Sequence, residues 1–176
     1  MNQLTQNRAG AAAAAVPVAP APTQYLTFTL GGETFAIGIL GVKEIIEYTS
    51  LTDVPMMSDC IRGVINLRGA VVTVMDLSVR FGRASTPVTK RTCIIIVEVE
   101  DGEERQVIGV VVDAVNAVLE IAAGDIEPPP AFGAHIRNDY IAGMGKINGR
   151  FVILLDIGQV FAGLQTDDAA LAAPDQ

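Results

Sequence analysis

Residues 61–82 read Ile61-Arg-Gly63-Val-Ile-Asn-Leu-Arg68-Gly69-Ala-Val-Val-Thr-Val-Met-Asp76-Leu-Ser-Val-Arg-Phe81-Gly82, and residues 141–161 nearly repeat them. The later copy is Ile141-Ala-Gly143-Met-Gly-Lys-Ile-Asn-Gly149-Arg-Phe-Val-Ile-Leu-Leu-Asp156-Ile-Gly-Gln-Val-Phe161. Ile61 and Ile141 match at the same offset as four further pairs: Gly63 with Gly143, Gly69 with Gly149, Asp76 with Asp156, and Phe81 with Phe161. We call these shared residues the structural repeat, and their common spacing indicates an internal duplication.

A second, weaker pair of segments precedes the two copies. Gly41-Val-Lys-Glu-Ile-Ile-Glu47 resembles Ala114-Val-Asn-Ala-Val-Leu-Glu120. The duplication therefore extends beyond the repeated segment and predicts two copies of one small β unit. Such a design suits the binding of partners better than it suits chemistry.

The composition narrows the fold and the class of partner. The chain has 176 residues, half of them hydrophobic, with no tryptophan and few aromatic residues. Valine, isoleucine and leucine must then build the core, and runs of β-branched residues favour strands. A formal net charge of −8 provides no attraction to phosphate groups, so we expect no binding to nucleic acid or to an anionic membrane surface.

The cysteines and the termini predict a cytoplasmic protein. Cys60 and Cys93 are the only cysteines, and they form no CxxC motif or spacing with histidine that suits zinc. Free thiols are the simpler interpretation and favour a reducing compartment. The N-terminus lacks a secretory signal, and no apolar run reaches transmembrane length, so we expect no direct membrane insertion.

Composition also marks the limits of the folded region. Residues 1–23 are rich in alanine and proline, which predicts a disordered tail. Residues 166–176 form a second flexible tail. The folded domain then covers about 24–165.

Short strands and tight turns fill this domain. Alternating apolar residues and turn-forming pairs predict hairpins that turn at Gly31-Gly32, Asn66–Gly69, Asp101-Gly102 and Asn148-Gly149. Asp76 and Asp156 would each cap a short helical turn, because an aspartate can accept the free amides of a first turn. Ser58-Asp59 would cap a further helical turn before Gly63.

Each half then holds four or five short strands and one helical turn. A unit of this size is too small for a sandwich and suits a small barrel of the SH3-like kind. We therefore predict an all-β fold of two pseudo-symmetric SH3-like five-stranded β-barrel subdomains with short helical turns. The polar segment 83–91 separates a first barrel at about 24–82 from a second at about 92–165. Whether the two barrels intertwine stays open at this point.

The residues offer no arrangement that suits catalysis. The single histidine, His135, lies in a loop rich in proline, glycine and alanine, without a serine or cysteine nucleophile nearby. Asp76 and Asp156 occupy matching positions, which we expect to have like environments, whereas a catalytic acid–base pair needs unlike ones. No nucleotide-binding or hydrolase motif occurs. We expect no enzymatic activity, no cofactor and no metal.

Two charges stand among apolar residues in the first half. Arg68 lies in a predicted turn and Glu44 in an apolar segment, so the two could form an ion pair if their segments are neighbours. One alternative is an edge salt bridge of little energetic value. Their counterparts in the second half, Asn148 and Ala117, are uncharged. Where duplicated units diverge from neutral to charged, the change favours a role in partner binding over a role in the fold.

The motifs of this chain resemble those of the CheW family, the coupling proteins of bacterial chemotaxis. The resemblance covers about residues 24–165 and rests on separated motifs in the same order. They are Phe28-Thr-Leu-Gly-Gly-Glu-Thr-Phe-Ala-Ile37, Val42-Lys-Glu-Ile45, Gly63-Val-Ile-Asn-Leu-Arg-Gly69, Val71-Val-Thr-Val-Met-Asp-Leu77, Gly109-Val-Val-Val-Asp113-Ala-Val115 and Tyr140-Ile-Ala-Gly143. Thr73 departs from the family, which commonly has proline at this position.

The resemblance implies two SH3-like barrels and the role of a scaffold or adaptor. Members of the family link the cytoplasmic tips of membrane chemoreceptors (methyl-accepting chemotaxis proteins) to the regulatory domain of the histidine kinase CheA. Other copies of the adaptor are further partners in the array rings. A receptor tip is a helical hairpin that docks in an apolar groove between the barrels. The resemblance places this receptor-binding groove at Ile39, Val42, Glu44, Arg68, Val115 and Val118.

Two other interpretations compete with this one. The first is a small β-barrel enzyme or ligand sensor with a pocket between its halves. The aliphatic groove residues, with no nucleophile or base among them, disfavour it. The second is a fragment of a larger protein, either the regulatory domain of the kinase or an adaptor fused to a receiver domain. We expect the tails to be too short for such a neighbour.

Overall fold

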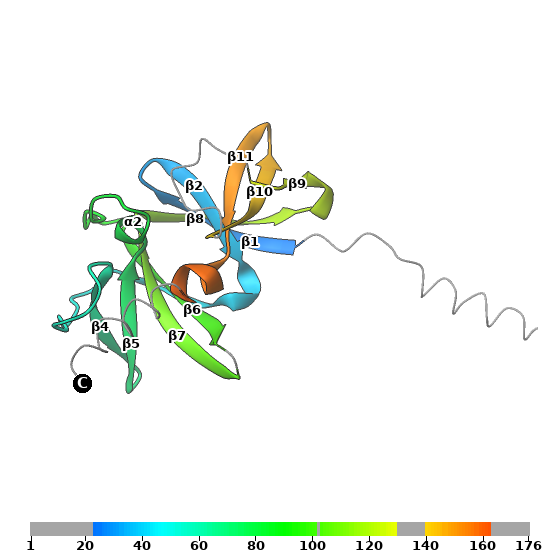
Figure 1. The fold of residues 1–176 in the computed structure, drawn as a ribbon. Helices are drawn as coiled ribbons and strands as arrows, with labels where there is room; N and C mark the ends of the chain where they lie inside the picture. Colours follow the sequence, from blue (N-terminus) through cyan, green and yellow to red (C-terminus); the bar gives the residue numbers. More distant parts are fainter. Residues whose placement is uncertain (1–22, 102, 130–139, 163–176) are drawn as a thin grey trace, which may run out of the picture.

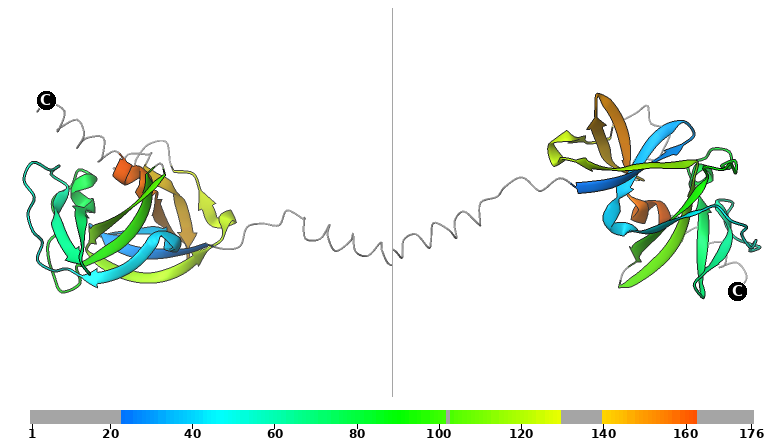
Figure 2. Two further views of the ribbon diagram at one scale, coloured as in Figure 1. Left: turned by 90° about the horizontal axis from the view of Figure 1, so that it is seen from below. Right: turned by 180° about the vertical axis from the view of Figure 1, so that it is seen from behind.

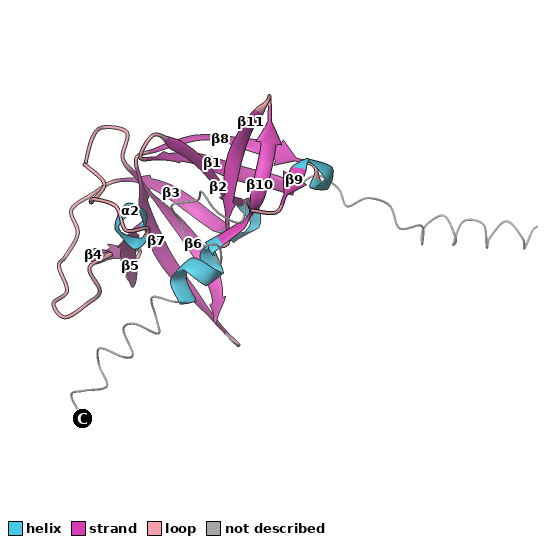
Figure 3. Ribbon diagram, turned by 45° about the horizontal axis from the view of Figure 1, so that its top comes forward, coloured by secondary structure: helices cyan, strands magenta, loops and turns pink. Residues whose placement is uncertain are grey.

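The computed structural model describes residues 23–101, 103–129 and 140–162 (Figure 1). Most of the tail predicted over 1–23, the tail predicted over 166–176 and His135 lie outside these residues. The described chain forms two lobes, one built on a six-stranded sheet and one on a five-stranded sheet. Strands dominate it, and the helical segments are short (Figure 3). The prediction of an all-β fold with two SH3-like barrels and short helical turns is confirmed.

The strands and helical turns follow one another closely along the chain. The strands are β1 (Thr23–Leu30), β2 (Glu33–Gly38), β3 (Val42–Glu47), β4 (Ile61–Leu67), β5 (Ala70–Asp76), β6 (Cys93–Asp101), β7 (Glu104–Val112), β8 (Ala114–Ile121), β9 (Ile126–Glu127), β10 (Ile141–Ile147) and β11 (Arg150–Leu155). The helical turns are η1 (Ile39–Gly41), α2 (Leu77–Arg80) and η2 (Ala123–Asp125), and residues 157–162 are helical as well. The six-stranded lobe has the order β8-β1-β2-β11-β10-β9, and the five-stranded lobe has the order β3-β6-β7-β5-β4.

The two lobes exchange their hairpins. The hairpin β1–β2 of the first half pairs with β8 and β11 of the second half, and β6–β7 of the second half pairs with β3 and β5 of the first. The pairings β2–β11 and β5–β7 are parallel, so a crossover must join them rather than a tight turn. The lobes therefore do not follow the predicted division into 24–82 and 92–165, because each lobe takes one hairpin from the other half.

The repeated hairpins turn where the sequence predicts. Arg68 and Gly69 have φ angles of +54° and +89°, and Asn148 and Gly149 have φ angles of +50° and +79°. Two successive positive φ angles give the two-residue turn whose twist matches that of the flanking strands. The Asn66 side-chain oxygen also accepts a hydrogen bond of 2.9 Å from the backbone N–H of Gly69. This geometry fixes Arg68 at the end of the β4–β5 hairpin.

Gly63 and Gly143 let a neighbouring segment approach their strands closely. In both copies the pairing register skips the residue before this glycine, Arg62 in one and Ala142 in the other. A Cβ atom on Gly63 would lie 2.4 Å from the carbonyl oxygen of Thr52, and one on Gly143 would lie 2.8 Å from Cγ2 of Ile126. Thr52 occupies this space by exchanging two backbone hydrogen bonds with Val64, of 3.0 and 2.9 Å. The repeated glycines thus leave room for Thr52 beside β4 and for Ile126 of β9 beside β10.

One hydrophobic cluster joins the two lobes, and we call it the interlobe cluster. It contains a row of aromatic rings in the order Phe28, Phe35, Phe81 and Tyr140, with successive ring centroids 6.0, 5.7 and 6.0 Å apart. Phe161 is buried in the same cluster. The helical residues 157–162 lie where the lobes meet, as the views of Figures 1 and 2 show. Burial of this shared cluster favours one folded unit over two independent barrels.

The two repeated aspartates have unlike surroundings. Both accept a hydrogen bond at the start of a helical turn, Asp76 from the N–H of Ser78 (3.0 Å) and Asp156 from the N–H of Gln159 (3.2 Å). Asp76, however, is completely buried, whereas Asp156 is exposed. The expectation that duplicated positions share one environment is therefore wrong for this pair.

Asp76 is also the centre of a polar node. Its carboxylate accepts hydrogen bonds from the N–H and hydroxyl of Thr86, both 2.9 Å long, and from Nη1 of Arg62 at 3.0 Å. Arg62 donates in addition to the carbonyl of Thr86. The second half has Ala142 where the first has Arg62, so it has no equivalent ion pair at that position. The node ties the segment 83–91 to β4 and α2.

The segment after Ser58-Asp59 forms one hydrogen-bonded turn, as predicted, but no helix. The N–H of Ile61 donates to the carbonyl of Ser58 at 2.9 Å, and β4 begins at Ile61 itself. Only two residues separate the potential cap from the strand, which leaves room for a single turn and no helix.

Candidate partner-binding face

Strands β3 and β8 are equivalent edge strands of the two lobes. Each stands at the end of its sheet, with one paired neighbour, β6 for β3 and β1 for β8. Each pairing also skips one residue near its start, at Lys43 in β3 and at Asn116 in β8. Such a bulge reverses the alternation of side chains along a strand. The pseudo-symmetry of the fold therefore extends to irregularities in its edges.

Four aliphatic side chains of these edges face the interlobe cluster. On β3, Val42 lies opposite Val97 and Ile45 lies opposite Ile95. On β8, Val115 lies opposite Phe28 and Val118 lies opposite Leu26. Directly opposed residues share one face of a sheet, and all four opposing residues belong to the interlobe cluster.

This set of side chains is only partly covered. Ile45 is 41% exposed and Val118 is 47% exposed, whereas Val42, Val115 and Ile39 of η1 are half-buried against the interlobe cluster. We call these five residues the aliphatic face. Four of them, namely Ile39, Val42, Val115 and Val118, are among the predicted groove residues.

Glu44 lies on the other face of β3. It stands opposite Ile96, which belongs to a separate cluster inside the five-stranded lobe together with Ile46. The bulge at Lys43 separates Glu44 from Val42, although a regular strand would place both on one side. The six predicted groove residues thus fall into two groups: the aliphatic face, and the pair Glu44 and Arg68.

Glu44 and Arg68 form a two-point ion pair. Nη1 of Arg68 donates to Oε2 of Glu44 at 2.5 Å, and Nη2 donates to Oε1 at 2.9 Å. The hydrogen bond from Arg68 lowers the pKa of Glu44 below its ordinary value and raises the pKa of Arg68. Glu44 therefore remains ionised at a lower pH than a free glutamate, and the pair is lost as the pH falls through this lowered pKa. The predicted ion pair is confirmed.

The ion pair lines a hollow of about 400 Å³ over the starts of β5 and β7, which we call the β5–β7 hollow. Its other walls include Lys43, Val71, Arg105 and Phe161. The Arg68 side chain is 72% exposed and that of Glu44 is 27% exposed. Arg68 is therefore accessible to a partner while its orientation is held by Glu44.

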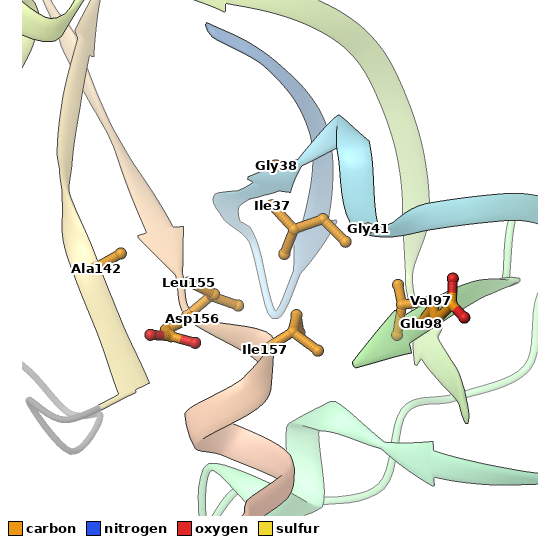
Figure 4. Close-up of a pocket in the computed structure, with 9 residues that line it drawn as sticks. All are labelled: Ile37, Gly38, Gly41, Val97, Glu98, Ala142, Leu155, Asp156 and Ile157. Atoms are coloured by element: carbon orange, nitrogen blue, oxygen red, sulfur yellow. The ribbon is translucent and has the colours of Figure 1, made fainter. Parts of the chain in front are cut away.

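A smaller hollow of about 230 Å³ lies between the lobes beside η1 (Figure 4). Ile37, Val97, Leu155 and Ile157 give it apolar walls, and the carboxylates of Glu98 and Asp156 stand at its sides. Sequence reasoning missed this hollow, because its walls come from four strands and two turns that are far apart in the chain.

Sequence reasoning also missed Ile45 as a member of the aliphatic face. The sequence did contain a signal for Ile45. The alignment of Gly41–Glu47 with Ala114–Glu120 makes Ile45 the equivalent of Val118, a predicted groove residue. The bulge at Lys43 had no such signal, since a bulge depends on pairing with β6. A regular strand would have grouped Glu44 with Val42 and excluded Ile45.

Neither a metal site nor a membrane span is found in the part of the chain that the structure describes. Residues 23–101, 103–129 and 140–162 contain no group of three or more His, Cys, Asp or Glu side chains able to hold a metal ion. Among the same residues, no helix is both long enough and apolar enough to cross a membrane. Cys60 and Cys93 are free thiols, and burial raises the pKa of Cys93.

Known proteins are similar to this chain in sequence and in fold. The family model for the CheW-like domain matches residues 24–165. Chemotaxis protein CheW of Klebsiella aerogenes is 36% identical over 84% of this chain and 85% of its own length, and that of Rhizobium meliloti is 32% identical over 83% and 92%. The crystal structure of the scaffolding protein TtCheW from Thermoanaerobacter tengcongensis superposes with a TM-score of 0.72 and 34% identity, covering 81% of this chain and 89% of that one. The chain therefore belongs to the CheW family, the coupling and scaffold proteins of bacterial chemotaxis.

Proposed function

We propose that the protein couples the cytoplasmic tips of chemoreceptors to the histidine kinase CheA and helps to build the receptor–kinase array. The observation that carries this proposal is the aliphatic face, which presents partly exposed side chains from the edge strands of both lobes. The membership of the CheW family supports the same role. The proposal assigns no chemical step, cofactor or metal to the protein.

The aliphatic face suits a receptor tip in the form of a helical hairpin. An amphipathic helix binds by placing apolar side chains, spaced at about one turn, against a complementary apolar surface. Complete burial of a fully exposed valine or isoleucine side chain contributes about 1.5–3 kcal/mol. Ile45 and Val118 are already more than half covered in the free protein, so the two together offer about 1.5–3 kcal/mol of binding free energy. Arg68 would fix the orientation of the receptor, because charges at the rim of an interface give specificity more than affinity.

The kinase and further copies of the protein would bind elsewhere. The regulatory domain of CheA resembles this fold, so we expect it to meet the exposed strand edges at the ends of the lobes. Other copies of the protein would use the same edges in the array rings. The protein would then sit on the cytoplasmic side of the membrane through its partners, without inserting into the bilayer.

Replacement of Arg68 by alanine tests the role of the ion pair. We expect the affinity for a receptor-tip hairpin to fall several-fold, while the urea midpoint of unfolding stays close to that of the wild type, as is usual when an exposed ion pair is lost. Titration calorimetry measures the first quantity and urea denaturation the second. Arg150 is a matched control, because it is also exposed beside a repeated hairpin turn, in the other lobe. Unchanged receptor affinity for Arg68→Ala, or an equal loss for Arg150→Ala, would remove Arg68 from the site.

A further inference from the structure

The β5–β7 hollow differs in charge from the rest of this acidic protein. Lys43, Arg68 and Arg105 line it, and Glu44 is the one carboxylate among its walls. The chain as a whole has a formal net charge of −8. The sign of the charge in this hollow is therefore opposite to that of the chain as a whole, which favours an acidic occupant.

The positive charges of the hollow are incompletely neutralised by the protein itself. Both oxygens of Glu44 accept hydrogen bonds from Arg68, and Lys43 interacts with Glu44 through its charge only. The ion pair of Arg105 with Glu100 is long, with 3.8 Å between Nε and Oε2, and both side chains are more than two-thirds exposed. A long and exposed pair of this kind contributes little. Arg105 is therefore available to a second carboxylate.

The walls of the hollow also contain exposed apolar surface. Val71 is 72% exposed on β5, and Phe161 closes the hollow from the helical residues 157–162. Isolated exposed apolar residues are normal, but here one lies inside a concave surface rimmed by positive charge. An occupant that combines carboxylates with aliphatic side chains would match both properties.

The C-terminal segment of the same chain has this composition. Residues 163–176 read Gly-Leu-Gln-Thr-Asp167-Asp168-Ala-Ala-Leu171-Ala-Ala-Pro-Asp175-Gln, with three aspartates, two leucines and no lysine or arginine. Phe161, a wall of the hollow, stands two residues before this segment. The residues between Phe161 and Asp167 can span up to about 20 Å when extended, which exceeds the width of a hollow of about 400 Å³.

We propose that residues 163–176 fold back into the β5–β7 hollow, with Asp167 and Asp168 facing Lys43 and Arg105. Attachment to Phe161 favours this occupant over a separate acidic partner, because a short tether gives an effective concentration in the millimolar range. The segment would cover Arg68 and compete with a receptor for it. The docking itself does not depend on the proposed function, whereas this competition does.

Zero-length cross-linking of the full chain with a carbodiimide tests the docking. The reagent joins a lysine amine to a carboxylate only when the two are in contact, and the chain has three lysines: Lys43, Lys90 and Lys146. We expect monomeric protein to yield links from Lys43 to Asp167 or Asp168, and at least about fivefold fewer such links from Lys90 and Lys146. Salt at about 1 M shortens the screening length to about 3 Å and should reduce the Lys43 links.

Charge variants supply the controls. Arg105→Gln should lower the yield of Lys43 links roughly threefold, the effect of weakening one exposed charge contact, whereas Arg150→Gln should leave it unchanged. The proposal is overturned if Lys43 links are no more abundant than Lys146 links. It is also overturned if they occur only in cross-linked dimers, because the occupant would then be the segment of a second copy.

A binding measurement separates the docking from its consequence. If the segment covers Arg68, the full-chain variant D167N/D168N should bind a receptor-tip hairpin severalfold more tightly than the wild type. Equal affinities would overturn the competition, and the cross-links would still decide the docking. If neither protein binds the hairpin, the proposed function fails, and the cross-links again decide the docking independently.

Discussion

Replacement of Asp76 by alanine is expected to lower the free energy of unfolding by about 3–5 kcal/mol, the usual effect of removing one partner of a buried ion pair. Asp76 is completely buried and accepts hydrogen bonds from Ser78, Thr86 and Arg62. Its loss leaves the side chain of Arg62, which is 21% exposed, without its carboxylate. It also leaves the N–H and hydroxyl of Thr86 without their acceptor.

Asp156 provides the control for this prediction, because it occupies the same position of the structural repeat. Its carboxylate is exposed and accepts one hydrogen bond from Gln159 as a helix cap. Loss of a cap costs about 1 kcal/mol, so Asp156→Ala should be much the milder change. Urea denaturation followed by circular dichroism measures both. Equal destabilisation by the two variants would show that the cap, and not the polar node, determines the effect.

Replacement of Val118 by aspartate is expected to lower the affinity for a receptor-tip hairpin by at least about tenfold. The change removes the apolar surface that the receptor would cover, worth about 1 kcal/mol for a side chain that is half exposed, and it places a charge in the contact, which costs more. Val118 is 47% exposed in the free protein, so the fold itself should tolerate the change. Ile45→Asp should have a similar effect, because Ile45 occupies the equivalent position on β3.

Phe151 is the matched control for this second prediction. It is a larger apolar residue that is 51% exposed, but it lies on β11 outside the aliphatic face. Phe151→Asp should leave the receptor affinity unchanged. Titration calorimetry measures the receptor affinity of the three variants, and thermal unfolding in parallel shows whether each variant is folded. A loss with Phe151→Asp as large as that with Val118→Asp would mean that general surface hydrophobicity, and not this face, binds the receptor.

Local features of the fold were predictable from the sequence. The turns at Arg68-Gly69 and Asn148-Gly149 follow from short-range backbone preferences, and so do the caps at Asp76 and Asp156. The structural repeat identified equivalent positions before any strand pairing was known. Comparison of the two halves also pointed to Glu44 and Arg68, whose counterparts in the second half are uncharged, and the structure pairs them.

Features that depend on long-range pairing were not predictable in this way. The exchange of hairpins between lobes arises from the parallel pairings of β2 with β11 and β5 with β7, for which a hairpin motif carries no signal. The polar node depends on Thr86, which donates two hydrogen bonds to Asp76. Thr86 lies in the segment 83–91, where the sequence shows no hydrophobic periodicity. The bulge at Lys43 decides that Ile45, and not Glu44, faces the interlobe cluster, and it depends on the register with β6.

Reconstitution with receptors and kinase tests whether this protein couples the two. Receptor-tip fragments held in a clustered array would be mixed with CheA, with and without the protein, and kinase autophosphorylation would be measured. We expect the rate to rise well above that of kinase and receptor alone when the wild-type protein is added. Val118→Asp should fail to raise it, and Phe151→Asp should raise it as the wild type does. A rate that is the same with and without the wild-type protein would contradict the coupling role.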